Sequence, residues 1–542
     1  MKKILAIILA AFCTSLHAQN TPNAKVVDDP ARRPLPEGTK GIVIDGTIDD
    51  SKIYPNTKRA FQVFVPQEYK GTDSAALVVG LDGNLFGAIT VIDNLIKSGE
   101  MPVTIGIFLQ PGVSYDSDNS VIRYNRSNEF DRTDARLASF LEQEVIPLVE
   151  SMQTPDGRKI LISHNPNDRA ITGASSSGIA AFTVAWERPD LFARVYSSVG
   201  TFVGMRGGNE YPVLVRKTEP KAIRIFLQDG VNDTWNHIFG DWWEQNQLMA
   251  SALNYAGYEF DYKWDRGNHS ITYGTRAYPD AMRWLWRGWP EPVKAGTTMN
   301  ATISQTVSVQ KPWTIADPFT AAALSDTLAV LICEPAPLHK LSAKKGANML
   351  IKHNGTDVAK FVANPYRVLP LHNGDKYISN SEGEIFLLKK DAKKAIKLNT
   401  LPTSGSEIAI SPNGKLLVAA EKNSNWLISY IIAPDGTLQA GQQFYWLHNP
   451  DNHTNTPYGN MAFDTEGNLY VATPIGIQIC DHNGRVRGIL PLPGAGRKVD
   501  AIAFVGNRIF AKCGNILYVR EVGKTGHNSW NAPIDVKSQG QG

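Results

Sequence analysis

The sequence predicts two folded domains of different class, an α/β domain over residues 40–292 and an all-β domain over residues 311–525. In the first, short apolar runs that end in Gly, Asp or Pro alternate with amphipathic segments, as in ALVVGLD (76–82) and IRIFLQD (223–229). This alternation predicts a mostly parallel sheet with helices on both faces, because such strands are buried on two sides. In the second, the helical period nearly vanishes. A chain of 542 residues is long enough for both domains.

The predicted all-β domain contains a repeated plan of apolar strand, polar turn with glycine, and apolar strand. The segments IAISPNGKLLVAAE and MAFDTEGNLYVATP both follow this plan. Such repetition is typical of the blades of a β-propeller, for which we expect six blades, with a β-sandwich as the alternative. Residues 293–310 are predicted to form a linker, and residues 526–542 a polar tail.

The amino-terminal residues have the pattern of an export signal. MKKILAIILAAFCTSLHAQN contains two lysines, an apolar run and then small and polar residues. This pattern predicts a signal peptide over residues 1–18 with cleavage after Ala18. A lipoprotein anchored at Cys13 is the alternative, although the bulky Phe12 fits a lipobox poorly. No later apolar run approaches the roughly 20 residues of a membrane-spanning helix, so we expect a periplasmic or secreted protein without a transmembrane segment.

Charge and cysteine content argue against several classes of partner and cofactor. The formal net charge is +3, from 55 basic and 52 acidic residues, and no basic run stands out, so a nucleic-acid partner is not expected. Removal of the signal would leave Cys333, Cys480 and Cys513, which lack CxxC spacing and form at most one disulfide. We therefore expect no zinc site and no cofactor.

The segment RAITGASSSGIAAF (169–182) predicts a strand, a sharp glycine turn and a helix of small residues. This is the layout of a nucleophile elbow, where a side chain projects above the sheet and the helix N-terminus offers amides to an oxyanion. Counted from Gly173, Ser175 is the nucleophile and Ser177 occupies a glycine position. Counted from Ala174, Ser176 is the nucleophile, but the first glycine is lost. A serine-rich helix cap is the non-catalytic interpretation.

Three histidines in the first domain are candidates for the general base. His164 lies before the elbow in a polar turn, and His237 follows the segment DGVNDTWN. His269 lies in a glycine-bearing loop after the presumed last strand. The chain order of serine, then an acid after a strand, then histidine after the last strand is the α/β-hydrolase order, which favours His269.

The orienting acid and the oxyanion hole follow from the same order. Asp229 and Asp233 both follow the run IRIFLQ. Asp233 is favoured, because its displacement into the loop lets its carboxylate reach Nδ1 of His269, whereas Asp229 is suited to shaping the turn. The loop GLDGNLFG (80–87) follows an early strand, so we expect the backbone amides of Asn84 and Ser176 to form the oxyanion hole.

These segments are recognisable as a family pattern. Residues 41–290 resemble the enterochelin-esterase-like branch of the esterase D family, which also contains feruloyl and acetyl esterases. The resemblance implies an α/β-hydrolase fold, with Ser175 as nucleophile, Asp233 as acid and His269 as base. Ser177 departs from the Gly or Ala that is usual two residues after the nucleophile, and we expect this to be tolerated. The resemblance is carried by LDGN, RYNRSNEFD, GASSSGIAAFTVAWERPDLFARV, GTFVGMRGGNEYP, FLQDGVNDTWN, GDWWEQNQ, GNHS and RWLWRGWPEP.

The second domain resembles the senescence-marker-protein/gluconolactonase propellers, through SPNGKLLVAAE, FDTEGNLYVATPIGIQICDHNGRV and KCGNILYVREV. That family holds one divalent metal through a Glu, an Asn and an Asp. The corresponding positions here are Ala321, Ser406 and Gly459, or Asn460 with a shifted gap. Alanine and glycine side chains cannot ligate a metal, so we expect no metal and no lactonase chemistry. The propeller is then expected to bind glycan, position the esterase or serve as architecture.

The sequence thus predicts an exported serine esterase that cleaves carbohydrate-linked esters, such as feruloyl or acetyl esters of plant glycans. Its substrate would be a small-molecule or oligosaccharide ester. Hydrolysis of a siderophore trilactone is a second enzymatic alternative, and a glycan-binding protein with a relic hydrolase domain is the non-enzymatic one. Candidate substrate-binding residues are Tyr124, Arg126, Arg206, Trp242 and Trp243.

Overall fold

The computed structural model describes residues 28–316, 352–353, 356–400, 407–420, 424–449, 458–494 and 498–536. The predicted signal peptide, Cys13 included, lies outside these residues. The chain forms two compact units. One comprises the chain up to Pro212 with Lys221–Asn254 and Tyr258–Gly296, and the other comprises Val213–Pro220, Tyr255–Gly257 and the chain from Thr297. None of the helices described is long and apolar enough to cross a membrane.

The first unit is built on an eight-stranded mixed sheet with the strand order β1-β2-β4-β3-β7-β8-β9-β12. β2 pairs antiparallel with both β1 and β4, and the remaining neighbours are parallel. The predicted mostly parallel sheet is therefore confirmed, with an antiparallel edge. The strands are β1 (Ile42–Ile48), β2 (Arg59–Val65), β3 (Ala76–Leu81), β4 (Thr104–Leu109), β7 (Arg169–Ala174), β8 (Arg194–Ser198), β9 (Arg224–Gly230) and β12 (Glu259–Asp265).

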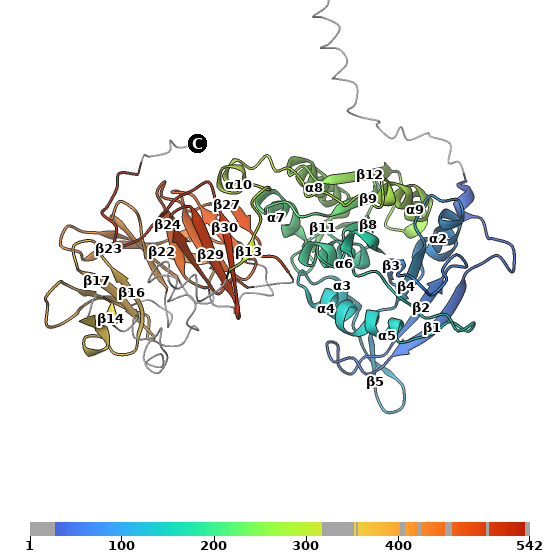
Figure 1. The fold of residues 1–542 in the computed structure, drawn as a ribbon, viewed down its shortest axis with the longest axis horizontal. Coiled ribbons are helices and arrows are strands. Elements are labelled where there is room, and N and C mark those ends of the chain that lie inside the picture. Colours follow the sequence, from blue (N-terminus) through green and yellow to red (C-terminus); the bar gives the residue numbers. More distant parts are fainter. Residues whose placement is uncertain are drawn as a thin grey trace, which may run out of the picture. The chain divides into compact units, whose positions relative to one another are not determined.

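Helices cover both faces of this sheet, because its central strands are apolar throughout; every residue of β3, β4 and β7 is buried. α2 (Ala88–Lys97) and α9 (Ile271–Trp286) lie on one face, and α3 (Arg126–Phe130), α4 (Arg136–Phe140) and α6 (Ser176–Glu187) lie on the other (Figure 1). The core under α2 and α9 contains Phe86 stacked on Tyr278 at 5.2 Å. Both helical layers were predicted from the sequence.

Shorter elements complete this part of the chain. A 3-10 turn, η2 (Leu85–Gly87), follows β3, and the hairpin of β5 (Val113–Tyr115) and β6 (Val121–Tyr124) precedes α3. The others are η1 (Pro30–Arg32), the π turn η3 (Leu141–Val145), α5 (Ile146–Glu150), η4 (Pro166–Asp168), η5 (Gly208–Glu210), α7 (Tyr211–Lys217), β10 (Trp235–Asn236), β11 (Gly240–Asp241) and α8 (Trp242–Tyr255). Because β3, β7, β9 and β12 run in one direction, the loops after them gather at one edge of the sheet.

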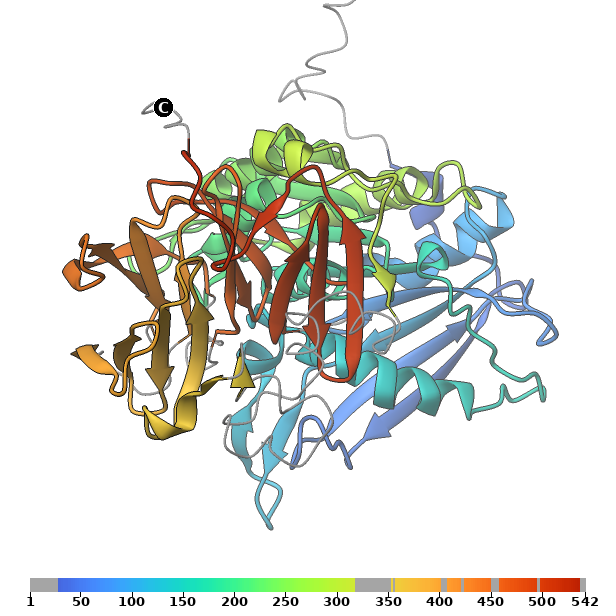
Figure 2. The same ribbon diagram turned by 60° about the vertical axis from the view of Figure 1, so that its left-hand side comes forward.

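The second unit is all-β and propeller-like, but the expectation of six blades is wrong: its described residues form four blade-like sheets. The innermost strands β16, β20, β24 and β28 are neighbours in that order, and β13 from the start of the unit completes the last sheet beside β30. Figures 1 and 2 draw these sheets in yellow to red. The sheets are β16-β17-β18-β19, β20-β21-β22-β23, β27-β26-β25-β24-β31 and β13-β30-β29-β28, and a further two-stranded ribbon pairs β14 with β15.

The bounds of these strands follow chain order. They are β13 (Thr314–Ile315), β14 (Lys352–His353), β15 (Thr356–Asp357), β16 (Pro365–Pro370), β17 (Lys376–Asn380), β18 (Glu384–Leu388), β19 (Ile396–Thr400), β20 (Ile408–Ile410), β21 (Leu416–Ala420), β22 (Trp426–Ile432), β23 (Leu438–Trp446), β24 (Met461–Asp464), β25 (Leu469–Thr473), β26 (Gly476–Cys480), β27 (Val486–Leu490), β28 (Ala501–Val505), β29 (Arg508–Cys513), β30 (Ile516–Glu521) and β31 (Gly526–His527). A 3-10 turn, η7 (Val358–Lys360), precedes β16.

The predicted linker and tail contain regular structure. α10 (Ala301–Thr306) lies within residues 293–310, and its Ile303 is buried in a core of the second unit together with Val307. The amide side chain of Asn300 caps this helix by accepting from the Ile303 N–H at 3.2 Å. β31 lies within residues 526–542 and pairs with β24.

The described residues include two of the three cysteines and two of the positions that correspond to metal ligands in the propeller family. Cys480 is a buried free thiol that does not pair with Cys513, and Cys333 lies outside the described residues. Ala321 and Ser406 also lie outside them. A side chain at Gly459 would stand 2.2 Å from the carbonyl of Asp500. The side chain of Asn460 is bound to both backbone groups of Ile502, at 2.6 and 2.8 Å.

Candidate active site

Ser175 lies at the sharp turn between β7 and α6, in the backbone conformation φ 57°, ψ −122°. A positive φ is strained for a residue other than glycine, so the surroundings must hold it. The Ser175 N–H donates to the Ser198 carbonyl at 2.9 Å, and the Ser175 carbonyl accepts from the Thr201 N–H at 3.2 Å. Ser176, by contrast, is the first residue of α6 and is 6% exposed. Of the two frames left open by the sequence, the strained turn matches the one counted from Gly173.

The contacts of Gly173 and Ser177 explain why glycine and serine occur at these two positions of the turn. A Cβ at Gly173 would lie 2.1 Å from the backbone oxygen of Ser177, so the strand and the helix can approach this closely only with glycine there. The Ser177 hydroxyl accepts from the Ala174 N–H at 2.8 Å and donates to the Ala174 carbonyl at 2.7 Å. The serine in place of a glycine or alanine therefore closes the turn with two hydrogen bonds.

The three residues predicted as a catalytic group meet at this edge of the sheet. His269 Nε2 lies 2.8 Å from Ser175 Oγ, and His269 Nδ1 lies 2.6 Å from Asp233 Oδ1. The Asp233 side chain is fully buried, whereas that of His269 is 28% exposed. An imidazole held by a carboxylate on one nitrogen and facing a hydroxyl on the other can accept the hydroxyl proton.

The loops after β9 and β12 are joined through their backbones. The Asn232 N–H donates to the Gly267 carbonyl at 3.0 Å, and the Val231 N–H to the Asp265 carbonyl at 2.9 Å. A Cβ at Gly230 would lie 2.4 Å from the Gly267 oxygen, so this approach requires glycine. Because the two loops are bound together, Asp233 on one reaches His269 on the other.

Asp229 sits behind this pair, and sequence reasoning weighed it as the alternative acid. It is fully buried at the end of β9, and its Oδ1 accepts from the Gly230 N–H at 2.7 Å. Burial, and then the Asp233 carboxylate, raise the pKa of Asp229 to about 10, so it is protonated at neutral pH. Burial opposes ionisation of Asp233 as well. Hydrogen bonds with His269 and Asp229 outweigh it and hold the pKa of Asp233 below its usual range.

The protonated Asp229 therefore has a clear partner. The Oδ2 atoms of Asp229 and Asp233 are buried, and neither has another hydrogen-bond partner among the residues described. A neutral carboxyl group carries one O–H donor, which this arrangement directs at the free oxygen of Asp233. Asp229 thus holds Asp233 from the side opposite His269.

The loop predicted to supply the second oxyanion amide follows β3, the strand beside β7. Its backbone is irregular, with φ of 64° at Asp82 and 80° at Gly83. The left-handed backbone at Gly83 favours glycine, and a Cβ there would also displace the end of the Gln110 side chain. Asn84 precedes η2, and its side chain accepts from the Ile89 N–H at 3.1 Å. The Ser176 N–H, the first of α6, has no acceptor within its own helix.

Of the five predicted substrate-binding residues, Arg126 and Trp242 contact the framework of the site. Arg126 binds Asp82 with both ends of its guanidinium, at 2.9 Å and 2.6 Å. Trp242 is buried, lies edge-on to the His269 ring at 5.5 Å and donates from Nε1 to Thr201 Oγ1 at 3.2 Å. Thr201 Oγ1 is in turn 3.4 Å from Ser175 Oγ.

The other three make different contacts. Trp243 packs edge-on against Trp264 of β12 at 5.3 Å. Tyr124 is 76% exposed, and with Arg206 it lines a cavity beside α3. The two remaining histidines are outside the group: the side chain of His164 is 80% exposed, and the ring of His237 lies 6.4 Å from Trp235.

Sequence reasoning missed Thr201, the neutral state of Asp229 and the support behind the histidine loop. Gln228 connects that loop to β8, because it accepts from Ser198 Oγ at 2.5 Å and donates to Asp265 at 2.9 Å. No local pattern marks these residues. The only available signal was the position of Gln228 and Asp229 at the end of a predicted buried strand.

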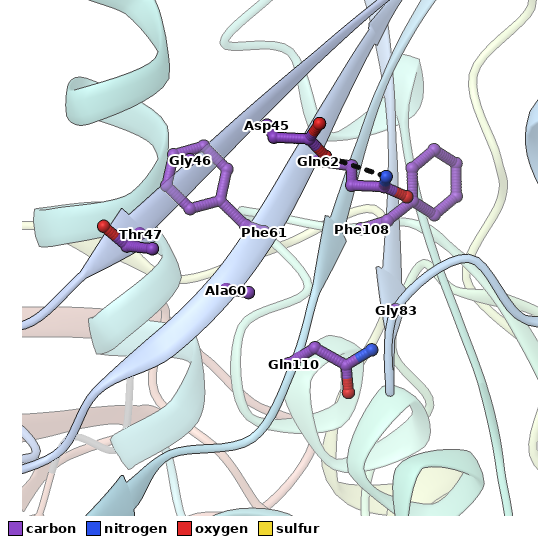
Figure 3. A pocket seen from close by; sticks show the side chains of 9 residues that line it. All are labelled: Asp45, Gly46, Thr47, Ala60, Phe61, Gln62, Gly83, Phe108 and Gln110. Atoms are coloured by element: carbon purple, nitrogen blue, oxygen red, sulfur yellow. Dashed lines mark hydrogen bonds between the residues drawn. The ribbon is translucent and has the colours of Figure 1, made fainter. Parts of the chain in front are cut away.

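A separate cavity of about 600 Å³ lies on the face of β1, β2 and β4 (Figure 3). Gln62 donates to Asp45 across it at 2.9 Å, and Phe108 and Gln110 line the β4 side. Gly83 also lines the cavity, so the cavity borders the loop that carries Asn84. Within the described ranges, no cluster of three or more His, Cys, Asp or Glu residues is suited to hold a metal ion.

Comparison with known proteins agrees with the predicted resemblance. Residues 52–284 match the model of the esterase family, described as a putative esterase. No match is found among curated proteins. Among solved structures, a ferulic acid esterase matches at 18% identity and a TM-score of 0.36, with 46% of this chain and 98% of the other covered.

Two further structures are similar to parts of the chain. The enterobactin esterase of Shigella flexneri matches at 19% identity and a TM-score of 0.35, and covers 46% of this chain. The chain spans 60% of the length of that enzyme. A gluconolactonase of Xanthomonas campestris matches at 16% identity and a TM-score of 0.27, with 31% of this chain and 61% of the other covered. The family match identifies residues 52–284 as an ester-hydrolase domain.

Proposed function

We propose that the protein is an exported serine esterase that hydrolyses carboxylic esters on carbohydrate-linked substrates, with Ser175, His269 and Asp233 as its catalytic residues. The observation that carries this proposal is the hydrogen-bonded row Asp233–His269–Ser175, with distances of 2.6 and 2.8 Å. Feruloyl and acetyl esters of plant glycans are the substrates that the resemblance favours. The signal-like sequence MKKILAIILAAFCTSLHAQN supports export.

The first chemical step is attack by Ser175 Oγ on the ester carbonyl carbon. His269 Nε2 takes the hydroxyl proton as the bond forms, and Asp233 holds Nδ1–H and stabilises the imidazolium. The carbonyl oxygen becomes an oxyanion, which the N–H groups of Ser176 and Asn84 are proposed to bind. The imidazolium then protonates the departing alcohol oxygen, which leaves an acyl group on Ser175.

The second step releases the acid. His269 removes a proton from a water molecule, which attacks the acyl carbon, and Ser175 leaves as the proton returns to its Oγ. Asp233 remains ionised throughout. Asp229 supports this by donating its hydrogen bond to the oxygen of Asp233 that does not face the histidine.

Hydrolysis of 4-nitrophenyl acetate tests the proposed catalytic group. Ser175→Ala is expected to lower kcat by at least about 10³-fold, because no nucleophile remains. Ser176→Ala is the matched control, and it should retain activity because this residue contributes its backbone N–H. Full activity in both variants would refute the assignment. An inactive wild-type protein would favour the alternative of a glycan-binding protein with a relic hydrolase domain.

A substrate panel tests the proposed ester class. We expect feruloyl oligosaccharides or acetylated xylan to be hydrolysed with a higher kcat/KM than a ferric trilactone. A preference for the trilactone would replace the carbohydrate assignment with siderophore hydrolysis while leaving the catalytic residues in place.

A further inference from the structure

A second cavity in the first unit, of about 400 Å³, is lined by an unusual number of arginines. Arg123 reaches it from β6, Arg136 from α4 and Arg206 from the loop after β8. Tyr54, Tyr124 and Ser127 line it as well. The cavity therefore combines three guanidinium groups from three separate parts of the chain.

The three arginines are exposed on the surface of the first unit. Their recorded contacts are weak: Arg123 donates to Ser114 Oγ at 3.4 Å, and Arg206 to Ser127 Oγ at 3.3 Å. Arg136 lies over the Tyr54 ring at 5.6 Å. Most of their N–H donors therefore remain available to a ligand.

Three neighbouring arginines, by contrast, are paired with carboxylates. Arg59 is bound to Glu129, Arg126 to Asp82, and Arg132 to Asp134, each through two guanidinium nitrogens. Carboxylates are thus plentiful in this region, but they are already paired. Asp131 is a further buried carboxyl group; burial raises its pKa, and the charges of Arg126 and Arg206 oppose this rise. The arginines that line the cavity differ from their paired neighbours, because their guanidinium groups make only the weak contacts given above.

Tyr54 forms part of the wall of the cavity. Tyr54 is 2% exposed, so the wall is apolar below the guanidinium groups. Guanidinium groups with unused N–H donors are the partners that carboxylates prefer.

The cavity adjoins the catalytic residues through one layer of side chains. Arg206 donates to Ser127, and Asp131 lies against both Ser127 and Ser176. On the other side of Ser127, Arg126 is bound to Asp82 at the start of the proposed oxyanion loop. A group in the cavity would therefore belong to the same substrate as an ester at Ser175.

We infer that this cavity binds a carboxylate carried by the ester substrate, so that the preferred substrates are acidic, such as esters of uronic-acid glycans. The inference rests on the proposed function, because it extends the same site. Two or three of these guanidinium groups would surround the carboxylate oxygens.

A matched pair of substrates tests this inference. The 2-O-acetyl esters of a methyl glucuronoside and a methyl glucoside differ only at C6, as a carboxylate or a hydroxymethyl group. We expect wild-type kcat/KM to favour the glucuronoside by about tenfold or more at low salt, because charge-assisted hydrogen bonds form only with the carboxylate. The preference should shrink as the ionic strength rises.

Substitution then assigns the preference to the cavity. Arg136→Gln and Arg123→Gln should each lower the glucuronoside-to-glucoside ratio towards one. Lys70→Gln removes the same charge from an exposed position that does not line the cavity, and should leave the ratio unchanged. The ratio is independent of the fraction of folded enzyme, because both substrates are measured on the same preparation.

Free anions separate a substrate subsite from a general anion site. Free glucuronate should inhibit hydrolysis of the glucuronoside competitively, and more weakly in Arg136→Gln. Equal inhibition by inorganic phosphate would overturn the assignment to a carboxylate. A ratio near one in the wild-type protein, with 4-nitrophenyl acetate still hydrolysed, would refute the acidic substrate alone. Loss of both activities would refute the proposed esterase itself.

Discussion

Aspartate and serine side chains have different roles in the loops of the first unit and in the blade turns of the second unit. In the blade turns, Asp464 accepts from the N–H groups of Glu466 and Asn468 at 2.9 Å, within four residues of itself. Ser411 likewise accepts from the Leu416 N–H at 2.9 Å. In the first unit, the Asp233 carboxylate reaches His269, 36 residues away. The blade residues complete their own turns, whereas Asp233 bridges two loops.

This difference shows how a polar residue becomes available for chemistry. A side chain that closes its own turn stabilises that turn and has little capacity left. Asp233 and Ser175 are held by backbone contacts from elsewhere, such as those of Gly230, Gly267 and Ser198, so their side chains can meet another side chain.

The largest expected effect is on catalysis. Asp233→Asn should lower kcat for ester hydrolysis by about 10⁴-fold, because an amide at this position favours the wrong tautomer of the histidine. Steady-state kinetics with 4-nitrophenyl acetate measure it. Asp464→Asn makes the same chemical change in a blade turn and should leave kcat unaltered. A comparable loss in both variants would mean that the two regions do not differ in the way described.

The second largest effect is expected on stability, at the buried ion pair that joins α3 to β2. Arg59 and Glu129 are both fully buried and joined at 2.5 and 2.9 Å, and Arg59 also lies over the Phe140 ring at 4.5 Å. Arg59→Met should lower the free energy of unfolding by about 3–5 kcal/mol, because Glu129 would remain buried without its partner. Denaturant titration measures this loss. The double variant Arg59→Met/Glu129→Leu should recover much of it, and no recovery would contradict the explanation.

A smaller effect is expected behind the catalytic acid. Asp229→Leu should lower kcat by roughly 10- to 100-fold, because Asp233 would lose the donor on its second oxygen. Asp229→Asn retains an N–H donor at this position and should recover most of the activity. The pH profile of kcat separates this positioning effect from simple damage to the fold. Equal losses in the two variants would show that size, and not the hydrogen bond, matters at this position.

The smallest effect is the local one in the propeller-like unit. Asp464→Ala removes the acceptor for two backbone N–H groups, the Asn468 amide and the Tyr470 hydroxyl, and should lower the stability of this unit by about 1–3 kcal/mol. Thermal unfolding measures it, and ester hydrolysis at 25 °C should be unchanged. A loss of catalysis without a loss of stability would show that this turn does more than complete a blade.

The architecture of the first unit could be predicted because its causes are local in sequence. Buried parallel strands must be apolar, and the elbow needs small residues where strand and helix meet. The segment RAITGASSSGIAAF has both features, so it predicted β7 and α6. Chain order then directed attention to His269 and Asp233, and the structure brings these two side chains together with Ser175.

The parts that escaped prediction depend on contacts between distant residues. The sequence offered Arg126 as a substrate ligand, but nothing in it revealed that Asp82, 44 residues earlier, would accept that guanidinium. Trp243 was predicted to contact substrate, and the sequence did not reveal that it packs against Trp264. The protonation of Asp229 depends on its burial and on the charge of Asp233. The repeated plan of strand, turn and strand does not fix the number of blades, and the four sheets described here correct the expectation of six.

The contact between Gly230 and Gly267 has a practical consequence for redesign. With a Cβ at Gly230 only 2.4 Å from the Gly267 oxygen, neither loop can be exchanged for a foreign one unless its partner is exchanged too. Loop grafts that aim to alter the acyl or sugar preference should therefore transplant residues 230–233 and 265–269 as one cassette. Tyr124 at the end of β6 and Arg206 in the loop after β8 lie outside these segments and can be randomised independently.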